Sequence, residues 1–175
     1  SDPQTINTYI NILKKYNVDP TMVEIELTET AVVSEYESVR KLFDSFQLHG
    51  IKTAMDDFGS GYSSLNTIVD IPVDVIKIDR GFITSCLETD RGIYFLKHLI
   101  GMIQNLGYQI ICEGVETDEQ IEILRQIGCD EIQGYWYSKP LKMEDYKKLL
   151  QTEKISKGGG KTPKQTKSHK ICLMQ

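Results

Sequence analysis

The hydrophobic pattern of the chain changes repeatedly between helical spacing and short apolar runs. Three segments place apolar side chains on one helical face: Val39, Leu42, Phe43 and Phe46; Ile93, Leu96, Ile100 and Ile103; and Ile121, Leu124 and Ile127. Each segment is followed by a glycine that fits a left-handed helix cap, and a short apolar run comes directly after Gly50, Gly107 and Gly128. Two more apolar runs, near residues 22–28 and 74–79, bring the expected strands to five. This alternation predicts a parallel sheet with helices outside it.

The sequence also predicts where several helices begin. Ser34 with Glu37 and Thr117 with Gln120 have the spacing of a capping box, in which each side chain reaches the other residue's free backbone N–H. A further helix is expected before the first strand, and another near residues 143–151.

Polar side chains gather at the carboxyl ends of the predicted strands. They are Glu26, Asp56, Asp57, Lys77, Asp79, Glu113 and Gln133. The loops that follow the strands of a βα barrel build its active site at this end, whereas an open sheet concentrates such residues at one switch point. We therefore expect an α/β fold with about five parallel strands of a TIM-type barrel.

The acids among these residues suit a metal. Glu26, Asp56, Asp57 and Glu113 supply four carboxylates, and hard cations such as Mg²⁺ or Mn²⁺ take oxygen ligands and offset the repulsion between them. An isolated Asp pair is more often a solvated turn or a helix cap. This pair closes an apolar strand, and other strands end in the same way, so a divalent-metal site is indicated.

Lys77 lies in an apolar strand with Val75, Ile76 and Ile78, so its ammonium group needs a buried partner. It can form a salt bridge to Asp79 or to an acid of a neighbouring strand. It can also orient a water or stabilise phosphate charge in a transition state. The two roles are compatible.

Residues 57–65, DFGSGYSSL, are typical of a mobile active-site loop with Gly59 and Gly61 as hinges. DFG also occurs in protein kinases, but the glycine-rich loop and the HRD-type catalytic loop are missing. None of the three histidines ends a predicted strand. The sequence therefore shows no histidine placed for histidine-based metal hydrolysis or for Ser-His-Asp catalysis.

Charge is unevenly placed along the chain. Residues 154–175 hold six lysines and no acid, so the first 153 residues carry 14 basic and 25 acidic side chains, a balance of −11. An acidic body argues against nonspecific binding of nucleic-acid polymers. It suits a phosphate substrate if metal ions supply the local positive charge.

The remaining bulk properties indicate one soluble domain. The 175 residues are enough for one core, no apolar run approaches the roughly 18 residues of a membrane span, and no signal-peptide pattern begins the sequence, so a cytoplasmic location is expected. The four cysteines show no CxxC pair, which favours reduced thiols. Cys112 and Cys129 sit in or beside apolar runs and are expected to be buried.

Five segments together resemble the EAL family of cyclic di-GMP phosphodiesterases: EIELTE (24–29), AMDDFGSGYSSL (54–65), IPVDVIKIDRGFI (71–83), ICEGVET (111–117) and GCDEIQGYWYSKPL (128–141). The resemblance implies an incomplete modified (β/α)8 barrel, with residues 1–152 forming roughly the C-terminal two-thirds of an EAL domain. It also implies hydrolysis of cyclic di-GMP to linear pGpG with two Mg²⁺ or Mn²⁺ ions.

The resemblance implies roles for the residues at the strand ends. Glu26 and Asp56 would bind the first metal, and Asp57 would serve the second. Lys77 would hold the attacking water, and Glu113 would bind a metal or deprotonate that water.

Further positions match the family motif. Gln133 would complete the surroundings of the water and metals, and Glu29 would anchor the loop that begins at Phe58. The family uses this loop to couple metal binding to homodimer contacts. Asp79 and Glu116 match other polar positions of the family.

The departure from the family lies at the front of the chain. The Glu-Ala-Leu signature and an Asn ligand on the following strand precede the segment that Ser1 begins, so we expect a fragment of a longer protein with little activity of its own. An EAL-like module that binds cyclic di-GMP or a partner without hydrolysing it is the alternative. The retained carboxylates favour catalysis in the parent protein, and another metal-dependent barrel hydrolase would require an accidental match.

Residues 153–175 are lysine-rich and low in complexity, so a disordered tail is expected. GGGKT is not a Walker A motif, because Ile155 stands where glycine is required. The last four residues, from Cys172, satisfy a CaaX prenylation pattern, for which a chance match is the favoured explanation.

Overall fold

Five parallel strands form a single sheet in the computed structural model, which describes residues 3–61, 68–69 and 71–156. They are β1 (Glu24–Thr28), β2 (Lys52–Phe58), β3 (Val75–Ile78), β4 (Gln109–Cys112) and β5 (Glu131–Ile132). Each strand pairs with the next one along the chain, and every pair is parallel. The predicted α/β fold with a five-stranded parallel sheet is confirmed.

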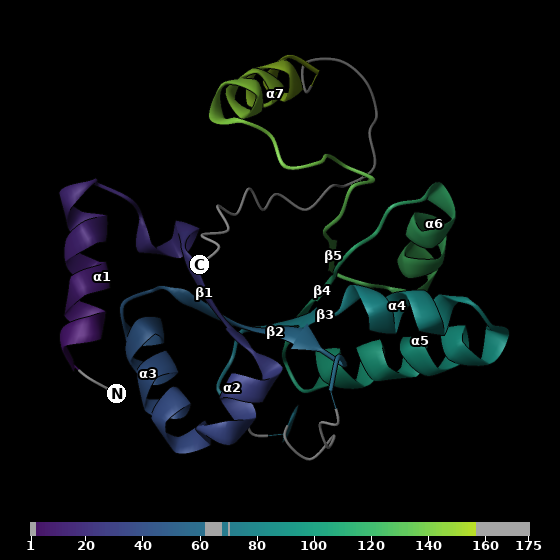
Figure 1. The fold of residues 1–175 in the computed structure, drawn as a ribbon, viewed down its shortest axis with the longest axis horizontal. Coiled ribbons are helices and arrows are strands. Elements are labelled where there is room, and N and C mark those ends of the chain that lie inside the picture. Colours follow the sequence, from purple (N-terminus) through teal and green to yellow (C-terminus); the bar gives the residue numbers. More distant parts are fainter. Residues whose placement is uncertain (1–2, 62–67, 70, 157–175) are drawn as a thin grey trace.

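The helices lie mainly outside the curved sheet, as Figure 1 shows. They are α1 (Pro3–Lys15), the short 3₁₀ helix η1 (Pro20–Met22), α2 (Glu29–Ser34), α3 (Tyr36–Leu48), α4 (Arg80–Leu87), α5 (Asp90–Asn105), α6 (Asp118–Ile127) and α7 (Met143–Ser156). The pattern predicted α1, α3, α5, α6 and α7 but missed α2 and α4. These two helices have six and eight residues, which is too short for a helical period to stand out.

Most of the predicted caps are present. Gly50, Gly107 and Gly128 have positive φ angles of 79°, 97° and 93°, so each turns the chain from a helix into a strand. Thr117 and Gln120 form the predicted capping box at the start of α6.

The second predicted capping box, Ser34 with Glu37, is wrong. Ser34 is the last residue of α2, and its hydroxyl donates to the Ala31 carbonyl at 3.3 Å. Glu35 precedes α3 and makes no side-chain capping bond. Because Ser34 is the last residue of α2, a helix that was not predicted, Ser34 cannot also be the N-cap of α3.

The core lies between the outer face of the sheet and the helices. Ile76 and Ile78 of β3 and Ile110 of β4 are fully buried in one cluster with Phe43 of α3 and Ile100 of α5. Burying a side chain of this size stabilises the fold by about 1.5–3 kcal/mol. Because successive strand residues point to opposite faces, the polar residues between these positions lie on the inner face.

The cysteines agree in part with expectation. Cys86, Cys112 and Cys129 are free thiols, with Cys112 fully buried and Cys129 partly buried. Cys172 lies outside the described residues.

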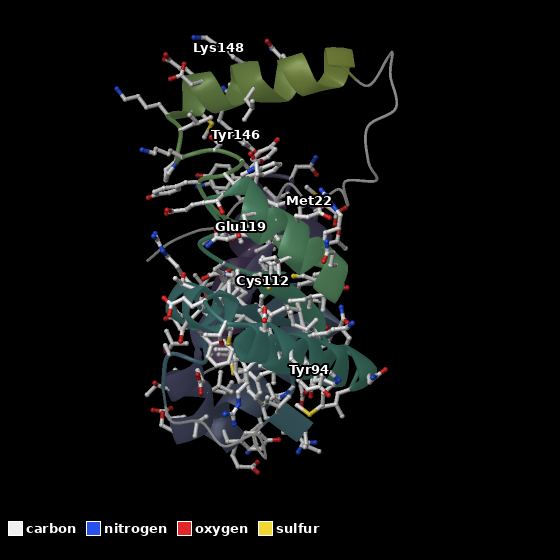
Figure 2. The ribbon with its side chains drawn as sticks, turned by 90° about the vertical axis from the view of Figure 1, so that its right-hand side faces the viewer. Met22, Tyr94, Cys112, Glu119, Tyr146 and Lys148 are labelled. Atoms are coloured by element: carbon white, nitrogen blue, oxygen red, sulfur yellow. The ribbon has the colours of Figure 1, made fainter. Side chains whose placement is uncertain are left out.

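Helix α7 lies apart from the sheet in both views (Figures 1 and 2). It continues to Ser156, beyond the predicted helix end at residue 151, and residues 157–175 of the predicted tail lie outside the described part of the chain. Across the described ranges, no helix combines the length and apolar character needed to cross a membrane.

Candidate metal and active site

The inner face of the sheet brings together charged side chains from four strands. Glu26 comes from β1, Asp56 from β2 and Lys77 from β3, while Glu113 directly follows β4. Parallel pairing in register places their strand ends at one edge of the sheet. The predicted gathering at the carboxyl ends is therefore present.

Lys77 is the centre of this group. Only 3% of its side chain is exposed, and its ammonium nitrogen Nζ lies 2.7 Å from Glu113 Oε1, 3.0 Å from Glu26 Oε2 and 3.0 Å from Asp56 Oδ1. Burial alone would lower the pKa of Lys77, but the hydrogen bonds and ion pairs with the three acids outweigh it and raise the pKa. Lys77 is therefore a buried cation. Two of its partners, Asp56 and Glu113, come from the strands on either side of β3, which matches one of the two predicted pairings, and Glu26 comes from β1, two strands away.

Asp56, Asp57 and Glu113 form a second arrangement around the same point. Each offers a carboxylate oxygen, and these three oxygens lie within 4.8 Å of one another. In a regular strand two successive residues would point to opposite faces. Here the pairing register of β2 with β3 shifts between Met55 and Phe58, and Asp57 has a φ angle of 58°. This irregularity turns both aspartates toward one group.

The electrostatics of the three acids suit a cation. Burial raises the pKa of Asp57, and the charges of Asp56 and Asp79 raise it further, while Lys77 lowers it. Burial also raises the pKa of Glu113, and its contact with Lys77 only partly offsets this effect. Ionising Asp57 and Glu113 together is therefore unfavourable without more positive charge, and a hard divalent cation with oxygen ligands would supply it.

Glu26 occupies a different position from the one expected of a ligand. Its Oε2 atom binds Lys77 and does not belong to the group of three acids that the described residues form. Its assignment as a metal ligand stays a prediction.

The segment after β2 is attached to α2 and α4. Glu29 is 3% exposed, and its Oε2 atom accepts a hydrogen bond from the Gly59 backbone N–H at 3.0 Å. Burial raises the pKa of Glu29, an effect that the Gly59 N–H opposes. Gly59 has a φ of 93°, and a Cβ atom there would lie 2.7 Å from the Phe82 ring. Phe58, also predicted for this loop, is buried as the last residue of β2.

The predicted anchoring of this segment by Glu29 thus has a hydrogen bond to match it. Gly61 is exposed, and residues 62–67 lie outside the described chain, so its role as a hinge stays a prediction.

A pocket of about 260 Å³ opens beside Glu113. It is lined by Arg80, Glu113, Gly114, Glu116, Gln133, Gly134 and Tyr135. Gln133 therefore lies at the same mouth as Glu113, as predicted. Glu116 forms an ion pair with Arg80 at 2.7 Å, whereas Asp79 caps α4 by accepting hydrogen bonds from Gly81 and Phe82.

Sequence reasoning missed Arg80 and Tyr135. Both follow residues that it selected, since Arg80 comes directly after Asp79 and Tyr135 two residues after Gln133, and that proximity was the available signal. A larger hollow of about 420 Å³ includes Tyr108 and Gln109 at the amino end of β4. It contains none of the acids described above. The smaller pocket, which includes Glu113 and Gln133, is therefore the better candidate for the active site.

Known proteins resemble most of this chain. A profile of the EAL domain matches residues 1–140. The cyclic di-GMP phosphodiesterase RocR of Pseudomonas aeruginosa is 35% identical over 130 residues, which are 74% of this chain and 33% of that protein. The chain spans 16–33% of the length of the curated relatives compared with it.

Solved structures share the fold. The EAL domain of Mycobacterium smegmatis DcpA is 31% identical with a TM-score of 0.76, covering 84% of this chain and 66% of that one. Klebsiella pneumoniae BlrP1, in a complex with manganese and cyclic di-GMP, is 29% identical with a TM-score of 0.73 and covers 79% of this chain and 36% of that one. A calcium complex of BlrP1 with the same nucleotide matches equally well.

Proposed function

Because the chain belongs to the EAL domain family, we propose that it forms part of a phosphodiesterase that hydrolyses cyclic di-GMP to linear pGpG in bacterial second-messenger signalling. The observation that carries the proposal is the buried Lys77 ammonium among three carboxylates, with Asp57 beside them. The substrate is inferred from RocR and from the nucleotide in the BlrP1 complexes.

The carboxylates provide the ligands for two divalent cations, Mg²⁺ or Mn²⁺. Asp56, Asp57 and Glu113 already converge, and Glu26 shares the Lys77 ammonium group with Asp56 and Glu113. When bound, the two cations would lower the pKa of a water and offset the negative charge of the phosphate. The manganese and calcium in the BlrP1 complexes support a divalent ion in this family.

The chain's own residues have three tasks in this proposal. Lys77 has three N–H donors and three acidic partners, so it fixes where the carboxylates lie, and a donor released from one of them can hold the attacking water. Glu113 has a raised pKa, which suits it to accept a proton from that water. The water oxygen bonds to phosphorus while the P–O bond on the opposite side breaks, and the leaving ribose oxygen takes up a proton from solvent to become a hydroxyl. The amide of Gln133 helps to orient the water.

The complete domain is proposed to act as a homodimer. Helix α5 exposes two adjacent aromatic side chains: Tyr94 and Phe95 are 67% and 49% exposed, whereas Leu96 and Ile103 are buried. Exposed apolar side chains that lie together often mark a protein–protein interface. Because Tyr94 is largely exposed, Tyr94→Glu should shift a dimer toward monomer in analytical ultracentrifugation without changing the fold.

A nuclease-type assay with cyclic di-GMP tests the activity. The purified chain is incubated with Mn²⁺ and the nucleotide, and pGpG is separated by chromatography. We expect slow hydrolysis that Glu113→Gln abolishes and that Glu119→Gln leaves unchanged, because Glu119 is an exposed acid on α6 (Figure 2).

The same experiment separates the alternative function. Binding of cyclic di-GMP in isothermal titration calorimetry without any pGpG, even in excess Mn²⁺, would identify a binding module. Hydrolysis that is indifferent to Glu113→Gln or to a chelator would contradict the proposed site.

A further inference from the structure

Two thiols lie in contact behind the strand that delivers Glu113. Cys112 is the last residue of β4, and Cys129 lies in the turn between α6 and β5. Their sulfur atoms are 3.1 Å apart, and Cys129 Sγ is also 3.0 Å from the Glu131 carbonyl oxygen. Cys112 has no exposed surface and lies in the interior of the molecule (Figure 2), whereas Cys129 is partly exposed.

We propose that Cys112 and Cys129 form a redox modification site, in which a disulfide closes between them when the protein meets a small disulfide such as oxidised glutathione. The sulfur atoms need to approach by about 1 Å to reach the bond length of about 2.05 Å. Both thiols are held by the fold, since β4 is paired on both sides, with β3 and β5, and the turn at Cys129 is tied to α6 by the hydrogen bond from Cys129 N–H to Leu124 O.

The exchange begins at the accessible thiol. Cys129 sulfur attacks one sulfur of oxidised glutathione, whose S–S bond breaks and releases one glutathione as its thiol. Cys112 sulfur then attacks Cys129 sulfur in this mixed disulfide and releases the second glutathione. The two hydrogens lost by the cysteines end on the two glutathione thiols, so the protein is oxidised by two electrons and the reagent is reduced by two.

The disulfide would link the two segments that form the shortest strand pair of the sheet. Strands β4 and β5 pair only at Ile111 with Glu131 and at Cys112 with Ile132. The Cys112 carbonyl accepts a hydrogen bond from the Gln133 N–H at 2.9 Å. The bond would therefore tether the segments that place Glu113 and Gln133. An effect of this tether on hydrolysis rests on the proposed function. Formation of the disulfide itself does not.

A variant that keeps only these two thiols tests the proposal. The chain with Cys86→Ala and Cys172→Ala is exposed to oxidised glutathione, and the thiols are then counted with Ellman's reagent in denaturant. We expect the count to fall from two to none, without glutathione remaining on the protein. Tryptic peptides 98–125 and 126–142 should become joined, and reduction should separate them.

Two further variants make the outcome decisive. Cys112→Ala in the same background should trap glutathione on Cys129, whereas Cys129→Ser should leave Cys112 unmodified. Closing the loop from residue 112 to 129 should also raise the unfolding midpoint by roughly 5–10 °C, reversibly with dithiothreitol. Stable glutathione on Cys129 in the two-thiol protein, disulfide-linked dimers, or no reaction would each overturn the proposal.

Discussion

Replacing Lys77 by methionine tests whether charge compensation organises the inner face. Methionine has similar length but no ammonium group, so Glu26, Asp56 and Glu113 lose their shared cation. Breaking a buried ion pair by removing one partner typically destabilises a protein by about 3–5 kcal/mol. These acids are 23%, 26% and 17% exposed, which places the expected loss toward the lower end.

Lys77→Met can lose only a limited amount of stability, because one of the three acids can bind a proton in place of the missing cation. A glutamate with an ordinary pKa near 4.3 can be neutralised at a cost of about 1.4 kcal/mol for each pH unit above that value. The loss in Lys77→Met should therefore not exceed about 4 kcal/mol at pH 7 and about 1 kcal/mol at pH 5. The pH dependence, more than the size of the loss, identifies the cause.

The direction of this pH dependence follows from the difference between the folded and unfolded pKa values of the acids. Without Lys77, the folded-state pKa of Glu113 rises further above its unfolded value, because burial and the charges of Asp56 and Glu26 already raise it. Stability from such a group is complete below the unfolded pKa and is lost as pH rises through the folded pKa. Lys77 itself has a raised pKa, so its own contribution in the wild type is lost only in strongly alkaline solution.

Urea denaturation of both proteins at pH 5 and pH 7 measures this difference. Lys97→Met is the matched control, because Lys97 is exposed on α5 and its loss should stay within about 0.5 kcal/mol. Millimolar Mn²⁺ should restore part of the stability of Lys77→Met at pH 7. An equal loss at both pH values would mean that packing, and not charge, governs the effect, and the reasoning would fail.

Three other experiments probe the site and its supports. Asp56→Asn should abolish the rise in unfolding temperature that Mn²⁺ gives the wild type, as measured by differential scanning calorimetry; an unchanged rise would remove Asp56 from the site. Gly59→Ala should destabilise the chain by about 1–3 kcal/mol, because of the positive φ and the Phe82 ring, and Phe82→Leu should recover part of that loss in a double-mutant cycle. Thr117→Ala should cost about 1 kcal/mol in urea denaturation, and Ser34→Ala less than about 0.5 kcal/mol; equal losses would contradict the capping assignment.

The sequence predicted features that depend on local periodicity. The strand that ends near Asp56 and the helix that begins after Thr117 carry their signals within a few residues, and both are present. Lys77 was recognisable as a buried cation because its neighbours are apolar. The prediction offered Asp79 or an acid of a neighbouring strand as its partner and did not foresee Glu26 from β1, because the register between distant segments decides which oxygen comes within reach.

Other features depend on long-range packing and had no local signal. The contact between Cys112 and Cys129 arises because α6 returns the chain beside β4. Helix α2 was missed because it is only six residues long, and the assignment of Ser34 failed with it. The position of Glu26 beside Lys77, outside the three-acid group, likewise depends on side-chain geometry that spacing does not encode.

The left-handed backbone at Asp57 determines which substitutions give interpretable results there. Aspartate and asparagine tolerate a φ of 58° better than most residues with a Cβ atom, whereas alanine favours a different geometry. Asparagine at residue 57 would remove the charge and keep the turn of the chain, so a change in metal affinity would report charge alone. Alanine would also allow β2 to regain regular pairing with β3, which would swing residue 56 out of register. The backbone conformation of β2, as much as its carboxylates, would therefore determine the metal affinity of the proposed site.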